Sequence, residues 1–458
     1  MINDTSLAFF LYFSVLLAIG IISHKKQASS ADFIVGNRSL NFWVIALSAH
    51  ASDMSSWLFM AFPAAFYLRG ISQLSIGIGL FIGMLLNWQF VSKKLRTLTE
   101  KFDSYTLPTF FETTFKDSSG IIRTITALVS VIFLACYLAA GLISMGLLLE
   151  SIFGIDYYLG LTVATVVVVI YTFSGGFITV AWTDLFQALF LMVVIVIVPL
   201  IGFLSLPNGW TSIVESAMSK QVDLHYSSLL TQESLLSMFF LITWGFGYFG
   251  QPHIVTKFMG IRNTQELTKS KYVGMAWMAI SLLAAAMIGV VSIAYFENST
   301  IKPELIFVEM TKELFHPLIA GIFLCGLIAA TMSTMDAQIL VAASVLSQDF
   351  YKHIIGKTPS EKTLVRVTRA AVVGISVIAL VIAFNKSPSV LDTVQYAWTG
   401  LGCAFGPLLL MALYSKSANR YGAISGILVG GFIAGFWDLT LPYFSDYAIP
   451  AMLPGFTL

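Results

Sequence analysis

The chain has 458 residues, of which 57% are hydrophobic and only 11% are charged, whereas soluble proteins carry roughly 25% charged residues. A soluble core could not bury so much apolar surface, so this composition excludes a water-soluble enzyme and indicates an integral membrane protein. The 25 basic residues nearly balance the 24 acidic ones, which argues against a nucleic-acid partner.

Apolar stretches of about 20 residues, the length that crosses a bilayer core, recur along the whole chain. They predict twelve spans, at residues 7–23, 42–68, 72–92, 121–149, 157–174, 180–206, 234–256, 272–296, 317–347, 370–385, 391–414 and 421–443. The longest gaps, 93–120 and 207–233, are of loop size. We therefore expect one all-α transmembrane domain in a lipid bilayer, with no separate soluble domain. No basic residue precedes the first span, so we expect no cleaved signal peptide.

The basic residues predict how the chain is oriented in the membrane. Apart from Arg123, which stands at the very start of the span 121–149, they all fall outside the predicted spans; by side of the membrane, 20 of the 25 belong to one side and 5 to the other. Cytoplasmic loops are the ones enriched in lysine and arginine. We therefore expect a multi-pass protein of the cell (inner, cytoplasmic) membrane whose N-terminus lies outside.

Among the aspartates inside predicted spans, Asp53, Asp184 and Asp336 stand out as candidates. A carboxylate in hydrocarbon is costly unless it is paired or solvated, and it therefore marks a candidate functional site. Because no lysine or arginine is expected at the same depth, the partner would be a metal ion or a proton. The alternative is a carboxylate that reaches interfacial water, which fits Asp184 best. Asp184 and Asp336 are candidates for a second cation or proton site.

The second span contains a cluster of small and hydroxylated residues around Asp53, from Ser48 to Trp57. Serine and aspartate compete with the helix backbone for hydrogen bonds, so we predict a break here. Carbonyl groups freed at a break suit Na⁺, and transporters build ion sites from broken helices at the membrane midplane. His50 titrates near neutral pH when unperturbed, although a packed polar residue is the commoner case.

The seventh span contains three glycines, a proline and several aromatic residues between Thr243 and His253. This composition makes a poor continuous helix and predicts a second break. Trp244 and Tyr248 are four residues apart and share a helix face, so their rings could wall a small cavity. An aromatic packing stripe is the alternative.

The ninth span carries the adjacent hydroxyl groups of Ser333 and Thr334, one helical turn after Ala330. The Ala330 carbonyl and the Thr334 hydroxyl share a face, and together they could complete a Na⁺ site with the second span. Taken alone, such residues are more often the contacts that pack helices together.

These segments resemble the sodium/solute symporter family, and within it the bacterial sodium/proline symporters. The resemblance covers essentially the whole chain and is carried by residues 36–40, 46–57, 175–187, 244–254 and 329–334. It implies a leucine-transporter-like core of two inverted five-helix repeats, here 42–206 and 234–414. Residues 1–35 would form a peripheral first helix, and 421–458 an additional helix and the C-terminal end. Relatives are expected to have one more span after this point.

The resemblance also implies roles for individual residues. Na⁺ would be held by the backbone of Ala51 and Met54 and by Ala330, Ser333 and Thr334. Asp53 and Ser55 would couple sodium to transport, and Arg38 would lie near the inner gate. The implied substrate pocket comprises Ser56, Tyr137, Trp244, Tyr248 and Pro252.

The function implied by the resemblance is Na⁺-coupled symport of L-proline into the cell by alternating access. The alternative is Na⁺- or H⁺-coupled uptake of another small amino acid or organic anion on the same fold. An intramembrane enzyme is not expected, because the sequence contains no HExxH motif and its histidines are scattered singly. A transporter-like sensor is not favoured either, because no cytoplasmic signalling domain is expected. We expect a small-molecule substrate, sodium and lipid as partners, with no nucleic acid and no obligate protein partner.

Overall fold

A computed structural model describes residues 4–23, 29–224, 232–296, 301–354, 359–385, 390–440 and 449–458. In this part of the chain all regular elements are helical, apart from one isolated bridge between Leu40 and Ile261. The first half comprises α1 Asp4–Ser23, α2 Ser30–Val35, η1 Gly36–Arg38, α3 Phe42–Ala51, η2 Trp57–Ala61, α4 Phe62–Arg69, η3 Gly70–Gln73, α5 Leu74–Leu86, η4 Asn87–Ser92, α6 Lys93–Lys101, α7 Leu107–Thr114, α8 Ile121–Phe153, α9 Tyr157–Ser174, α10 Phe177–Leu204 and α11 Trp210–Ser219. The second half comprises α12 Gln232–Ile242, η6 Thr243–Gly250, α13 Pro252–Met259, η7 Thr264–Glu266, α14 Leu267–Tyr295, η8 Pro303–Leu305, α15 Ile306–Leu314, α16 Pro317–Val345, η9 Leu346–Tyr351, α17 Lys352–Ile354, α18 Glu361–Phe384, α19 Val390–Tyr414, α20 Arg420–Thr440 and α21 Met452–Thr457.

Each predicted span coincides with a helix or with a helix that is interrupted. Among the described residues, seven helical stretches are long and apolar enough to cross a membrane. Four shorter apolar helices accompany them, among them residues 42–51 and 235–250 beside the two predicted breaks. The total of twelve spans and the division into repeats at 42–206 and 234–414 stay predictions.

Two gaps that we expected to be loops contain short helices, so that expectation is wrong. Helices α6 and α7 lie in the first gap, and α11 lies in the second. Helix α7 begins with a side-chain cap, since the Thr106 hydroxyl accepts from the Thr109 amide, and Pro108 stands in its first turn. Such local capping signals are independent of hydrophobic length, which is the property that identified the spans.

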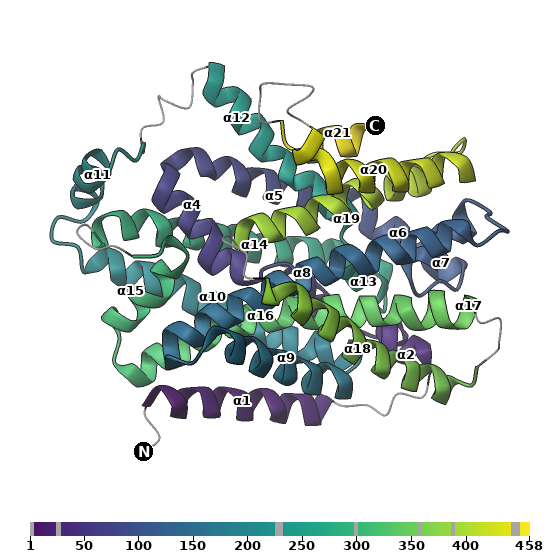
Figure 1. Cartoon of the computed structure of the whole chain (residues 1–458), viewed down its shortest axis with the longest axis horizontal. Helices are drawn as coiled ribbons and strands as arrows, with labels where there is room; N and C mark the ends of the chain where they lie inside the picture. Colours follow the sequence, from purple (N-terminus) through teal and green to yellow (C-terminus); the bar gives the residue numbers. More distant parts are fainter. Residues whose placement is uncertain are drawn as a thin grey trace.

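Long helices run beside one another through the middle of the molecule (Figure 1). Helix α10 packs against α3, α14 and α16, and α16 also contacts α1, α8 and α18. Helix α19 packs against η6, α8 and α20. Helix α1 lies along one edge (Figure 1). The interrupted elements α3 and η6 are therefore enclosed by continuous helices, which positions the breaks inside the bundle.

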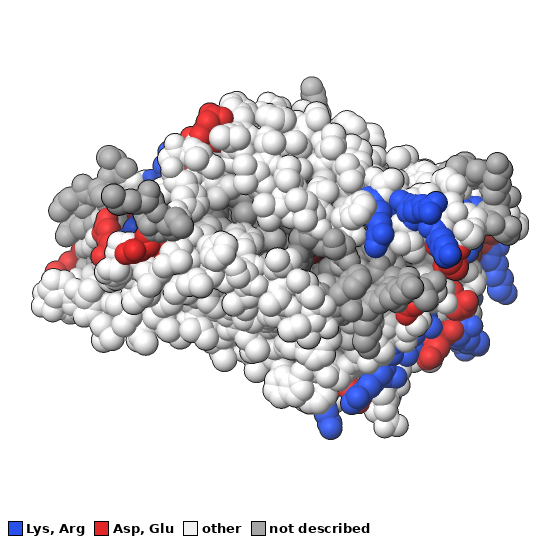
Figure 2. Space-filling model, turned by 90° about the horizontal axis from the view of Figure 1, so that it is seen from below, with Lys and Arg blue, Asp and Glu red and all other residues white. Residues whose placement is uncertain are grey.

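Charged side chains gather toward the two ends of the molecule and leave an uncharged middle (Figure 2). Most of the visible lysines and arginines lie at one end, the end that carries α6 and α17 in Figure 1. This distribution is expected of a protein whose middle lies in hydrocarbon. Of the residues counted for orientation, Lys25, Lys26, Lys357 and Lys386 lie outside the described residues. The outside position of the N-terminus stays a prediction.

Candidate functional site

The predicted break in the second span is confirmed. Helix α3 ends at Ala51, and the backbone over Ser52–Ser55 leaves the helix before a new helical segment starts. The Ser55 amide donates to the Asp53 carbonyl at 3.0 Å, so it does not form the helical bond to Ala51. The Ala51 carbonyl consequently becomes available to other partners at the C-terminal end of α3, where the helix dipole is negative.

Two hydroxyl groups of α16 meet the freed Ala51 carbonyl. The hydroxyls of Ser333 and Thr334 donate to Ala51 O at 2.8 and 3.2 Å. They also donate to Ala330 O, on their own helix, at 3.0 and 3.3 Å. All four residues are at most 1% exposed. Four buried oxygens from two helices thus converge, and oxygens are the ligands that a hard cation prefers.

Met54 is also a predicted sodium ligand, but none of the described contacts joins it to the four converging oxygens. Its side chain is fully buried, and its amide donates to the His50 carbonyl at 2.9 Å. His50 itself is fully buried and its ring packs against Trp88 and Trp277. The role of the Met54 backbone stays a prediction.

Asp53 lies in the middle of the break and is fully buried. Its Oδ2 accepts a hydrogen bond from the Tyr248 hydroxyl on η6, and its backbone carbonyl accepts from Trp57 Nε1 at 2.9 Å. Among the described residues, Asp53 Oδ1 has no hydrogen-bond partner. Asp53 therefore joins the first broken helix to the second and keeps one carboxylate oxygen available.

The predicted break in the seventh span is also confirmed. The tight helix η6 ends at Gly250, Gln251 is extended, and α13 begins at Pro252. The Gln251 amide group bridges the break, since its Nε2 donates to Gly247 O at 3.2 Å and to Trp398 O at 3.0 Å. Glycine is required at position 247, because a Cβ there would lie 1.9 Å from Trp398 Nε1. The break is therefore packed directly against α19.

A cavity lies between the two broken helices, with about 230 Å³ of empty space when the part open to solvent is included, and it is lined by Asp53, Trp57, Leu80, Tyr137, Trp244, Val394 and Trp398. The predicted substrate residues Tyr137 and Trp244 line this cavity. Tyr248 lies next to it, hydrogen-bonded to Asp53 and with its ring 4.9 Å from that of Trp398. The Tyr137 hydroxyl is buried and has no hydrogen-bond partner among the described residues.

Sequence reasoning missed four of the seven residues that line this cavity. Trp57, Leu80, Val394 and Trp398 were not named as substrate residues. Trp398 Nε1 donates to the backbone carbonyl of Trp244 at 2.9 Å, which fixes the Trp398 indole against the backbone of η6. The sequence pattern that could indicate Trp398 is a tryptophan followed closely by Gly400 and Gly402 within an apolar span. The same combination of tryptophan and glycines occurs at Trp244.

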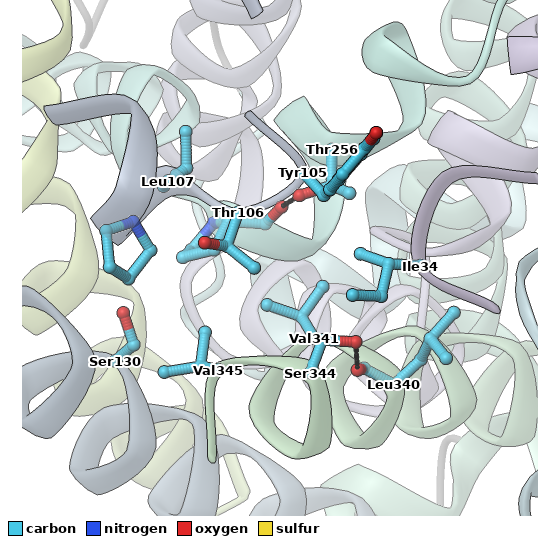
Figure 3. Close-up of a pocket in the computed structure, with 12 residues that line it drawn as sticks. Ile34, Tyr105, Thr106, Leu107, Ser130, Thr256, Leu340, Val341, Ser344 and Val345 are labelled. Carbon is cyan, nitrogen blue, oxygen red and sulfur yellow. Dashed lines mark hydrogen bonds between the residues drawn. The ribbon is translucent and has the colours of Figure 1, made fainter. Parts of the chain in front are cut away.

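Two other predicted substrate residues lie away from this cavity. Ser56 donates to the Ser144 hydroxyl on α8 at 2.7 Å, and it does not line the cavity. Pro252 lines a second cavity together with Tyr105, Ser130 and Ser344; its empty space is about 330 Å³ when the part open to solvent is included. In Figure 3, Tyr105, Thr106 and Leu107 face a row of residues on α16 across this second cavity.

The predicted gate residue Arg38 stands next to the second cavity. Its guanidinium donates to the carbonyls of Thr99 at 3.0 Å and Ser104 at 3.2 Å, and it lies over the ring of Tyr105. Burial, followed by the nearby Arg96, lowers the pKa of Arg38, but an arginine stays charged. Arg38 thus ties η1 to the segment that forms one wall of the second cavity.

One expectation about charge is wrong, because a lysine lies directly beside one of the three aspartates, Asp184. Lys257 is only 2% exposed, and its Nζ lies 2.9 Å from Oδ2 of the fully buried Asp184. The same oxygen accepts from the Ser48 hydroxyl at 2.6 Å. Lys257 directly follows the predicted seventh span, and the break at Gln251 means that hydrophobic length does not give the depth of α13.

Asp336 has a different environment. It is fully buried and accepts from the Thr172 hydroxyl at 2.6 Å, and its Oδ2 has no hydrogen-bond partner among the described residues. In the part of the chain that the structure describes, no group of three or more His, Cys, Asp or Glu residues could hold a metal ion. A second cation or proton site at Asp184 and Asp336 stays a prediction.

Comparison with known proteins places this geometry in a family. The model of the sodium:solute symporter family matches residues 33–430. The chain is 38% identical to the "High-affinity proline transporter PutP" of Bacillus subtilis over 96% of this chain and 93% of that protein. It is also 38% identical to the "Sodium/proline symporter" of Staphylococcus aureus (strain JH9), over 93% of this chain and 84% of that protein.

Solved structures agree on the fold. A Na⁺-coupled sialic acid symporter superposes with a TM-score of 0.84 at 20% identity, covering 99% of this chain and 95% of that one. MhsT in complex with L-phenylalanine superposes with a TM-score of 0.60 at 12% identity, covering 87% of this chain and 97% of that one. The chain is therefore a membrane transporter with an all-helical, leucine-transporter-like fold. It belongs to the sodium:solute symporter family, in which sodium is the coupling ion.

Proposed function

We propose that this protein takes up L-proline into the cell together with Na⁺, by alternating access. The relatives of similar length that share 38% identity are named as proline transporters. The observation that carries the proposal is the short segment from Ala51 to Asp53. Ala51 supplies the carbonyl that meets the α16 hydroxyls, and two residues later Asp53 lines the cavity. One break in one helix therefore serves both the ion and the substrate.

The cavity walls have the chemistry that a proline zwitterion needs. The indoles of Trp57, Trp244 and Trp398 offer apolar and aromatic surface for the pyrrolidine ring. The free Oδ1 of Asp53 can accept from the substrate ammonium, and the unpaired Tyr137 hydroxyl can donate to the substrate carboxylate. These two polar atoms are already buried, so a ligand that satisfies them removes a cost that the empty cavity carries.

Coupling follows from the shared segment. A sodium ion held by Ala51, Ala330, Ser333 and Thr334, with the Met54 backbone as a further ligand, fixes the backbone on which Asp53 is carried. Proline then binds a preordered site, and by thermodynamic linkage each ligand raises the affinity for the other by the same factor. Asp53 and the adjacent Ser55 are the proposed coupling residues.

Release toward the cytoplasm would pass the second cavity. Pro252 lines it on α13, and Arg38 holds Thr99 and Ser104 beside it. We assign Arg38 to the inner gate for this reason, with the N-terminus outside and the lysine-rich end of the molecule in the cytoplasm.

Uptake of labelled proline into proteoliposomes tests the proposal. We expect uptake with an inward sodium gradient and only background uptake with potassium in its place, and unlabelled proline should compete more strongly than other amino acids. The variant Tyr248→Phe removes one hydrogen bond to the Asp53 carboxylate. Loss of about 1.5–3 kcal/mol should raise the half-saturating proline concentration roughly 10- to 150-fold. The matched control Tyr157→Phe loses a buried hydroxyl that bonds to Ala383 O at 3.3 Å, away from the cavity.

Two outcomes would favour another function. Strong competition by a different amino acid or an organic anion, with weak competition by proline, would change the substrate. Uptake that follows a pH gradient in the absence of sodium would change the coupling ion to H⁺.

A further inference from the structure

A buried ion pair and the hydroxyl groups beside it join three of the helices around the proposed sodium site. Lys257 on α13 contacts Asp184 on α10 at 2.9 Å, and both side chains are at least 98% buried. The Ser48 hydroxyl on α3 donates to the same Asp184 oxygen at 2.6 Å, and that of Ser52 lies 3.5 Å away. Ser48 and Ser52 flank Ala51, so this cluster borders the sodium site.

Without the lysine, this cluster would be a set of cation ligands. A buried carboxylate and two hydroxyl groups from neighbouring helices are hard oxygen donors, and an uncompensated carboxylate in a membrane interior attracts a cation. The Lys257 ammonium already supplies that charge from within the chain. Among the described residues, Asp184 is the carboxylate within ion-pair distance of Lys257, and the ammonium also lies 5.4 Å from the centre of the Phe177 ring.

We propose that the Lys257 ammonium permanently fills the cation position on Asp184, so that the protein binds a single sodium ion. That ion lies at Ala51, Ala330, Ser333 and Thr334, and Asp184 binds none. Asp184 then acts as a structural anchor between α10, α3 and α13. The proposal rests on the proposed sodium site but not on the identity of the substrate.

The variant Lys257→Met tests this directly, because methionine keeps an unbranched apolar side chain while removing the charge. Asp184, with the Ser48 and Ser52 hydroxyls, is then free to take a second sodium ion. The experiment counts bound ²²Na⁺ per purified chain, with no proline present. We expect one ion in the wild type, two in Lys257→Met, and one in Lys257→Arg, which keeps the positive charge.

The double variant Lys257→Met/Asp184→Asn removes both charges and should return the count to one. A second double variant, Ser333→Ala/Thr334→Ala in the wild-type background, should lose the single ion. A wild-type count of two, or a count of one in folded Lys257→Met, would overturn the proposal. If Lys257→Met cannot be purified, the double variant Lys257→Met/Asp184→Asn is compared with the wild type instead. A count of one sodium ion in both proteins supports the proposal, whereas a wild-type count that is higher by one refutes it. Because these counts are made without substrate, a failure of proline uptake would leave them unaffected.

Discussion

Replacing Thr334 by alanine removes one of the two hydroxyl groups that meet the Ala51 carbonyl. The Thr334 hydroxyl lies 3.2 Å from Ala51 O and 3.3 Å from Ala330 O, so it is one of four converging oxygens. Loss of one partner at a buried polar site costs about 2 kcal/mol, the middle of the usual range. Since 1.4 kcal/mol is a factor of ten, we expect a roughly 30-fold rise in the sodium concentration for half-maximal uptake. The Ser333 hydroxyl, which lies closer to both carbonyls at 2.8 and 3.0 Å, should preserve residual binding.

The measurement is a sodium titration of proline uptake in proteoliposomes at fixed proline. A matched control exists on the same helix: Thr331 is 1% exposed, and its hydroxyl donates to Leu327 O at 2.9 Å, within α16 itself. Thr331→Ala should therefore keep the sodium dependence within about twofold of the wild type, because no partner on another helix is lost. Thr334→Ser, which retains a hydroxyl, should restore most of the sodium affinity. Equal sodium requirements in Thr334→Ala and Thr331→Ala would refute the site.

Two further predictions concern packing and capping. Gly247→Ala places a Cβ 1.9 Å from Trp398 Nε1, so the cavity wall must move, and we expect at least a tenfold loss of proline affinity. The control is Gly374→Ala: a Cβ at this position has no atom within 4 Å, so uptake should stay unchanged. Asp117→Asn weakens the acceptor for the Ile122 amide, which lies in the first turn of α8 at 2.8 Å, and should lower stability by about 1 kcal/mol, measured by thermal unfolding in detergent. Burial acts to raise the pKa of Asp117, but its hydrogen bonds and a nearby arginine outweigh this and hold the pKa below the ordinary value. The stabilisation is therefore present at neutral pH and is lost as the pH falls through that lowered pKa, where the variant and the wild type should converge.

Features that depend on neighbouring residues were predictable from the sequence. The spans follow from hydrophobic length, and the breaks at Ser52–Ser55 and Gln251 follow from local competition for backbone hydrogen bonds and from glycine and proline. Ser333 and Thr334 could be named because they are adjacent on one helix. That they meet Ala51, some 282 residues earlier in the chain, came from the family resemblance and not from their spacing.

Features that depend on depth or on distant helices could not be deduced in this way. The counts that set the orientation treat a lysine just after a span as a loop residue, so they place Lys257 outside the membrane. In a broken helix the span end does not mark the membrane surface, and α13 carries this lysine back to Asp184. Trp398 reaches the cavity from a helix 154 residues away from Trp244, a proximity that no periodicity encodes. Pro252 follows the break as predicted, but it lines the second cavity and not the one between the two broken helices.

The break after Ala51 has a mechanical consequence. In an unbroken helix, bending at this point would tear several backbone hydrogen bonds, each of which would be left unsatisfied in a medium without water. Here the Ser55 amide has already turned to Asp53, and two hydroxyl side chains hold the Ala51 carbonyl. Bending at this point therefore breaks fewer backbone hydrogen bonds than it would in an unbroken helix, and those that still cross the break are the bonds from the Asp53 and Met54 amides to the His50 carbonyl. An ion bound to the Ala51 carbonyl would stiffen this joint, and the joint would become flexible again once the ion has left.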